Sequence, residues 1–146
     1  MRLSVQQTAF DPAAELAAFS VAQSTVGAEV SFTGRVRDDT GTLVALEIEH
    51  YPGMTEAAIS AIMAEAVTRW QLAECLVIHR HGRLATGEAI MMVATAARHR
   101  AEAFAAAEYL MDYLKSRAPF WKREITDTGS TWVEAKATDE DALTRW

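Results

Sequence analysis

Alternation of apolar and polar residues, the pattern typical of β-strands, marks several short stretches of the chain. In residues 28–36, for example, Val30, Phe32 and Val36 fall on one face. The predicted strands are residues 3–7, 28–36, 43–50, 74–81, 88–96, 123–126 and 131–135. After the first, they form three neighbouring pairs with turn residues between them, so we expect three antiparallel pairs.

Apolar residues recur at helical spacing between these strands. Ile59, Met63 and Ala66, for instance, lie on one stripe of a predicted helix. The predicted helices are residues 11–22, 55–70 and 100–117, with a last short helix capped by Thr138. A strand, then a helix, then strand pairs separated by helices indicates an α+β fold with mainly antiparallel pairing. We expect a single domain spanning residues 1–146.

Composition restricts the class of protein but adds no detail to the predicted fold. Half of the residues are apolar and 23% are charged, as in ordinary globular proteins. The net charge of -6 argues against general affinity for nucleic acid. No window approaches a membrane span, and residues 1–7 lack the apolar core of a signal peptide. The single cysteine, Cys75, fits a reducing compartment, so a cytoplasmic location is expected.

Residues 111–124 hold the most informative cluster. They contain two of the chain's three lysines, Lys115 and Lys122. Each lysine is close to an arginine, and Pro119 between the two basic pairs forces the chain to turn. The turn can bring the cations together beside aromatic rings, which predicts an anion site with a lysine of lowered pKa. The alternative, a solvated helix end, explains Lys115 but not Lys122.

Two further cationic groups are candidates for anion binding. His99 and Arg100 stand at the predicted start of a helix, where free N–H groups attract phosphate. Arg35 and Arg37 end a strand and point to one side. Without context, an ordinary helix start and solvated arginines explain these two pairs better.

A metal site is not predicted. Cys75, His79 and His81 share strand parity, but Val77 interrupts that face and no second cysteine adjoins it. Buried or hydrogen-bonded histidines are the expected alternative. Cys75 lies inside a predicted strand, which argues against a catalytic cysteine. Phosphate-binding glycine loops and the Gly-x-Ser-x-Gly elbow are absent from the sequence.

Taken together, these motifs resemble the large, catalytic subunit of molybdopterin synthase. The matching segments are residues 32–37, 49–54, 78–80, 82, 87–88, 99–100, 103–104, 111–124 and 132–134. The resemblance runs from about Ala28 to the end of the chain, and residues 1–27 match only loosely. It implies an α/β hammerhead fold with an additional small antiparallel β-sheet.

The resemblance also implies an activity. Enzymes of this family convert cyclic pyranopterin monophosphate to molybdopterin by building a dithiolene. The sulfur arrives as a thiocarboxylate on the C-terminal Gly-Gly of a small ubiquitin-like partner. Two large subunits form a central homodimer, and a small subunit docks at each end to give a heterotetramer. No metal or other cofactor is implied at this step.

By the same resemblance, Lys115 and Lys122 are the catalytic pair. Lys115 is expected near the terminal glycine of the partner, and Lys122 near the substrate as an acid–base or electrostatic group. The implied substrate-binding residues are Arg37, His99, Arg100, Phe32 and Met111. His99 and Arg100 could reach the substrate from the second subunit of the dimer.

The chain departs from the family pattern at two positions. Arg35 stands where lysine is common, and Arg98 stands before His99 where a small residue is usual. An alternative function is a non-catalytic anion-binding or regulatory module that retains the partner-docking pocket. Retention of both lysines argues against this module. Two further alternatives are a scaffold without a pocket, which predicts no affinity for a ubiquitin-like protein ending in Gly-Gly, and a phosphate enzyme of another type, against which the absence of a phosphate loop argues.

Overall fold

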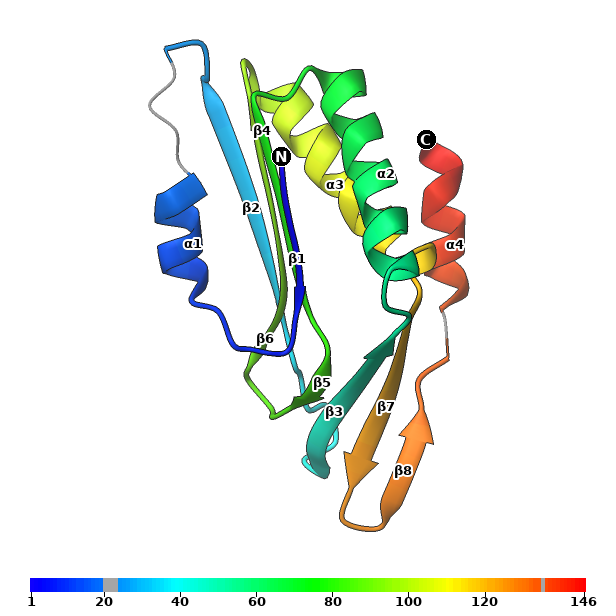
Figure 1. The fold of residues 1–146 in the computed structure, drawn as a ribbon. Coiled ribbons are helices and arrows are strands. Elements are labelled where there is room, and N and C mark those ends of the chain that lie inside the picture. The colour runs from blue at the N-terminus through cyan, green and yellow to red at the C-terminus, as the bar shows by residue number, and fades with distance from the viewer. Residues whose placement is uncertain (20–23, 135) are drawn as a thin grey trace.

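The computed structural model describes residues 1–19, 24–134 and 136–146, which form two β-sheets and the helices that cover them (Figure 1). The elements are β1 (Arg2–Gln6), α1 (Pro12–Phe19), β2 (Ala28–Arg35), β3 (Leu43–His50), α2 (Met54–Trp70), β4 (Glu74–Arg80), β5 (Gly82–Leu84), β6 (Ala89–Ala97), α3 (Arg100–Ser116), β7 (Phe120–Thr126), β8 (Gly129–Trp132), α4 (Ala137–Ala142) and a final 3₁₀ turn, η1 (Leu143–Arg145). Within the described residues, no helix is both long and apolar enough to cross a membrane.

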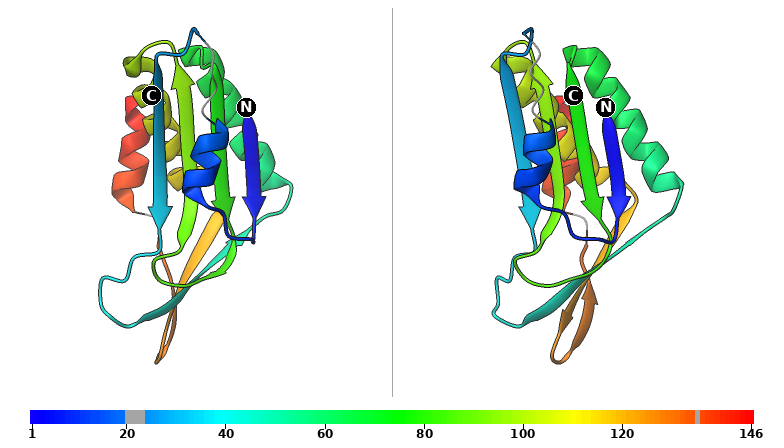
Figure 2. Two further views of the ribbon diagram at one scale, coloured as in Figure 1. Left: turned by 90° about the vertical axis from the view of Figure 1, so that its left-hand side faces the viewer. Right: turned by 60° about the vertical axis from the view of Figure 1, so that its left-hand side comes forward.

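The larger sheet has the order β1-β4-β6-β2. β1 pairs with β4 in parallel, and the other neighbours are antiparallel. Alternate residues of β4 point to opposite faces: Val77 packs with α2 and α3, whereas Leu76 and Ile78 pack against α1. Figure 2 shows α1 on one face and the two long helices behind the other. Because both faces are covered, β6 is almost continuously apolar and β4 is apolar from Cys75 to Ile78.

The smaller sheet has the order β5-β3-β7-β8 and is antiparallel throughout. It extends below the larger sheet in Figure 1. Its core contains Ile48 and Leu84, and Ile90 and Phe120 pack both on this core and on the main one. The α+β class, with an additional small antiparallel sheet, is therefore confirmed.

One predicted strand pair is wrong. Residues 28–36 and 43–50 lie in different sheets: β2 pairs with β6, and β3 pairs with β5 and β7. The chain does not turn back after β2, because Val36 is buried in the core of the small sheet. Backbone hydrogen bonds join Val36 to Gly87 and Glu88 instead. The other two predicted pairs, β4 with β6 and β7 with β8, are confirmed.

The ends of some elements differ from the prediction. β7 begins at Phe120, three residues before the predicted start, because Phe120 already pairs with His50 of β3. The last helix begins at Ala137 with Lys136 as its cap, so the predicted cap at Thr138 is wrong. Residues 20–22 of the first predicted helix, and residue 135 of the last predicted strand, lie outside the described residues.

Candidate functional site

A cavity of about 450 Å³ lies where the end of α3, the small sheet and α4 meet. All three lysines of the chain, Lys115, Lys122 and Lys136, contribute to its lining. The concentration of the lysines in one hollow of an acidic protein makes this cavity the candidate site.

The turn at Pro119 brings the first two lysines together. The backbone N–H groups of Arg117 and Ala118 both donate to the carbonyl of Tyr113, which ends α3 just after Lys115. The hydroxyl of Thr55 donates to the Pro119 carbonyl at 3.3 Å and ties the turn to α2. β7 then starts at once and carries Lys122 back to the cavity. The sequence-based expectation that the two lysines approach each other agrees with this geometry.

The two lysines have different electrostatic surroundings. Burial lowers the pKa of the Lys122 ammonium, the Lys115 cation lowers it further, and Asp139 opposes the change. Lys115 is about half exposed, and its Nζ lies 4.0 Å from Asp139 Oδ1. A lysine with a lowered pKa exchanges protons more readily near neutral pH. Lys122 is therefore the better acid–base group, while Lys115 provides positive charge.

The neighbouring arginines do not line the cavity. Arg117 pairs with Glu140 at 2.7 Å, and Arg123 pairs with Glu47 at 2.6 Å. Adjacent residues of a strand point to opposite faces, so Lys122 and Arg123 separate. The fold thus divides the cluster predicted from the sequence. The two lysines line the cavity, and the two arginines form ion pairs outside it.

Aromatic side chains form the walls. Trp121 and Trp132 are about half exposed, which leaves apolar surface beside the lysines. The guanidinium of Arg123 lies 5.2 Å from the ring centroid of Trp132. On the inner side, the rings of His79 and Phe120 stack with centroids 3.7 Å apart. Such walls can exclude water and hold a flat or extended ligand.

The remaining predicted residues lie elsewhere in this chain. His99 and Arg100 stand at the start of α3, fifteen or more residues before Lys115, a separation of about 22 Å along a helix. Arg37 is exposed and paired with Asp39 at 2.7 Å.

Phe32 and Met111 do not line the cavity either. Phe32 is exposed on β2, and Met111 packs against the main core. In one chain, none of the five predicted substrate-binding residues lines the cavity, although Met111 lies one helical turn before Lys115 on α3.

Of the lining residues, only Lys115 and Lys122 were singled out as site residues from the sequence, and Lys136, Asp139 and His79 are among those that were missed. Lys136 stood apart from the basic cluster, Asp139 was assigned to a helix start, and His79 was expected to be a core histidine. The rarity of lysine in the chain is the signal that could have identified Lys136.

Metal and thiol chemistry find no support in the described residues. There, no three His, Cys, Asp or Glu side chains are placed so that they could hold a metal ion. Cys75 is buried, and burial raises the pKa of its thiol to about 12, so little thiolate forms near neutral pH.

The fold and site define an α+β protein with a lysine-lined, aromatic-walled cavity beside a small sheet. The sequence adds the family: the MoaE protein model matches residues 5–117, and the chain belongs to this family. The catalytic subunit of molybdopterin synthase from Cereibacter sphaeroides is 64% identical over 146 residues, which cover 100% of both chains. That from Mesorhizobium japonicum is 57% identical and covers 97% of this chain and 91% of its own. The family model ends at residue 117, but the alignments with these two relatives continue past Lys122. The predicted resemblance is confirmed.

Solved structures of other proteins share the fold of this chain. The molybdopterin biosynthesis MoaE protein from Burkholderia ambifaria aligns with a TM-score of 0.84 at 49% identity, over 99% of this chain and 96% of its own. Molybdopterin synthase from Staphylococcus aureus gives 0.81 at 30% identity, over 90% and 96%. A complex of subunits 1 and 2 of the molybdopterin-converting factor from Helicobacter pylori shares the fold, with 0.79 at 19% identity over 92% and 91%.

Proposed function

We propose that this chain is the catalytic subunit of molybdopterin synthase and that it acts as a sulfurtransferase in the lysine-lined cavity. The observation that carries the proposal is the meeting of Lys115 and Lys122 in one aromatic-walled cavity. It is supported by the 64% identity to a molybdopterin synthase catalytic subunit over the whole chain.

The proposed sulfur donor is the C-terminal thiocarboxylate of a small ubiquitin-like partner that ends in Gly-Gly. The proposed acceptor is cyclic pyranopterin monophosphate. Both carry negative charge, and the three lysines that line the cavity outnumber its two carboxylates, Glu134 and Asp139, so the cavity attracts them although the chain as a whole is acidic. Trp121 and Trp132 offer apolar surface against which an extended tail or a flat pterin can pack.

The thiocarboxylate sulfur is already a nucleophile, so the chain does not need to supply one. Sulfur attacks the substrate carbon and displaces an oxygen substituent from it, and water then cleaves the resulting thioester to release the partner as a carboxylate and leave a thiolate on the substrate. A second thiocarboxylated partner repeats both steps at the neighbouring carbon to complete the dithiolene. Lys115 polarises the carbonyl of the partner's terminal glycine. Lys122 supplies a proton to the departing oxygen and takes one from the attacking water, a role that suits its lowered pKa.

We assign substrate phosphate and pterin binding to Arg37, His99, Arg100, Phe32 and Met111. Because one chain holds His99 and Arg100 at the opposite end of α3 from Lys115, the proposal includes a homodimer in which His99 and Arg100 of the second copy complete the cavity. One small partner on each copy gives a heterotetramer. We further infer that residues 1–146 act as one domain, because Phe120 packs on both cores. A cytoplasmic location stays a prediction from the sequence.

Reconstitution tests the proposal. Purified chain is mixed with cyclic pyranopterin monophosphate and with the partner in its thiocarboxylate or carboxylate form, and the product is followed as its fluorescent oxidised pterin. We expect dithiolene product only with the thiocarboxylate. Tight binding of the partner without any product would instead support a non-catalytic module.

A further inference from the structure

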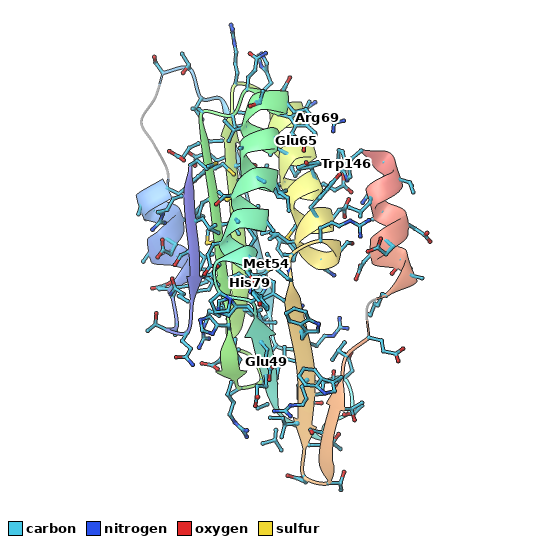
Figure 3. All side chains as sticks on the ribbon, turned by 45° about the vertical axis from the view of Figure 1, so that its right-hand side comes forward. Glu49, Met54, Glu65, Arg69, His79 and Trp146 are labelled. Atoms are coloured by element: carbon cyan, nitrogen blue, oxygen red, sulfur yellow. The ribbon has the colours of Figure 1, made fainter. Side chains whose placement is uncertain are left out.

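His79 lies near the end of β4, where the two sheets meet (Figure 3). It lines the same cavity as Lys115 and Lys122. Only 3% of its surface is exposed. A buried polar ring needs hydrogen-bond partners for both nitrogens, and the proposed reaction uses neither. We therefore expect the hydrogen-bond partner of the second nitrogen, Nε2, in the cavity.

Two contacts fix the ring of His79. Its plane lies 14° from that of Phe120, with centroids 3.7 Å apart. Its Nδ1 is 2.8 Å from the carbonyl oxygen of Arg80. A carbonyl oxygen only accepts, so Nδ1 carries the hydrogen and Nε2 keeps its lone pair. The side chain is therefore a hydrogen-bond acceptor at Nε2.

β7 carries Lys122 to the same cavity as this acceptor, close enough for the charge of the lysine to act on His79. Phe120 and Lys122 are two residues apart on the strand and share one face. Since His79 stacks on Phe120, its ring lies against the same face. All three side chains line the cavity. The Nζ of Lys122 is a donor that needs an acceptor in this half-buried position.

The surrounding charges keep His79 neutral. Burial lowers its pKa to about 3, the hydrogen bond to Arg80 opposes this, and the positive charges of Lys122, His50 and His81 lower it further. From α3 and α4, Lys115 and Asp139 also face Lys122. His79 thus adds no positive charge beside the lysine over the pH range in which the lysine titrates.

We propose that His79 is a positioning residue whose Nε2 accepts a hydrogen bond from Nζ of Lys122 and holds this lysine toward the reacting atoms. The catalytic consequence rests on the proposed function, whereas the hydrogen bond itself does not. An ammonium donates a stronger hydrogen bond than an amine, so the acceptor also favours the protonated lysine.

The three lysines allow a direct test by NMR. With ¹³Cε-labelled lysine, each resonance is assigned by a Lys→Arg variant and followed against pH. His79→Phe keeps a flat ring against Phe120 but removes the acceptor, and His79→Gln provides an acceptor oxygen. We expect His79→Phe to lower the pKa of Lys122 by about one pH unit. His79→Gln, and the control His81→Gln outside the cavity, should leave it near the wild-type value.

Single-turnover sulfur transfer gives the second readout. His79→Phe should slow it about tenfold while the Kd for the partner is unchanged, and His79→Gln should recover most of the rate. Equal titration of Lys122 in wild type, His79→Phe and His79→Gln would overturn the proposal. Absence of transfer by the wild-type chain would overturn the proposed function and leave the NMR result standing.

A measurement on the natural His79 covers the case in which His79→Phe does not fold. The ¹⁵N shift of His79 Nε2 reports whether this nitrogen accepts a hydrogen bond. We expect Lys122→Met to move that shift, because the donor is removed. An unchanged Nε2 shift would contradict the proposal.

Discussion

Lys122 and Lys115 face one cavity but differ in how far water reaches them. Lys122 stands two residues after the partly buried Phe120 on β7, and burial comes first among the causes that lower its pKa. Lys115 stands in the last turn of α3, about half exposed and near Asp139. The fold therefore gives one lysine the desolvated position of an acid–base group and the other that of a fixed charge.

The lowered pKa of Lys122 makes stability depend on pH. The unfolded chain binds the proton more tightly than the folded one, so the charged lysine costs stability below its folded pKa and this cost fades as pH rises toward 10.5. Lys122→Met should accordingly raise the Tm at pH 7, with a gain that shrinks by pH 10. Thermal unfolding followed by circular dichroism at both pH values is the measurement. A gain that grows with pH would show that the pKa is not lowered.

At the scale of elements, α4 and η1 hold one wall of the cavity in place. α4 carries Asp139, whose backbone carbonyl accepts a hydrogen bond from Ser116 at 2.8 Å. The segment is anchored at its other end by Trp146, which meets the rings of Trp70 and Tyr109 edge-on at 5.7 and 5.5 Å. Figure 3 shows Trp146 between α4 and the long helices.

Loss of this anchor should affect stability and the site together. Trp146→Ala removes the edge-on contacts and the bond from the indole N–H to Asp112 at 2.8 Å. We expect it to lower the free energy of unfolding by about 2 kcal/mol and to raise KM for the partner more than it lowers kcat. Urea unfolding and reconstituted turnover measure these effects. Thr144→Ala, which loses only a local turn bond, is the control, and an equal loss in both variants would contradict the anchoring role.

Sequence reasoning succeeded where the determinants are local. Pro119 had to end a helix, so the approach of Lys115 and Lys122 followed from neighbouring residues. The pairing of β3 with β7, and of β1 with β4, joins segments far apart in the chain and left no local signal. His79 was missed for the same reason: its role depends on the stack with Phe120, and burial alone made it resemble a core residue.

For the whole molecule, the length of α3 decides whether one chain can hold the complete proposed site. Arg100 begins the helix and Lys115 is in its last turn, so in a single chain the proposed phosphate site and the lysines are on opposite ends. A symmetric dimer can place the start of one α3 near the end of the other, because contacts across a two-fold axis are reciprocal.

Mixing inactive variants tests this arrangement. Lys122→Ala and Arg100→Ala chains are denatured together, refolded to allow exchange, and assayed for turnover. Random exchange of equal amounts makes half of the dimers hybrids. If Arg100 acts across the dimer, each hybrid has one intact site of two, so about a quarter of wild-type activity should return. If Arg100 and Lys122 act within one chain, no mixture should regain activity. Each variant refolded alone is the control.

The most direct test of the central claim is single-turnover sulfur transfer by Lys122→Ala with the thiocarboxylated partner. We expect a loss of at least about a hundredfold in the rate of dithiolene formation, with unchanged affinity for the partner. Arg83→Ala, an exposed change on β5, should match the wild-type chain. A Lys122→Ala chain that binds the partner and turns over at the wild-type rate would contradict the claim that this cavity performs the chemistry.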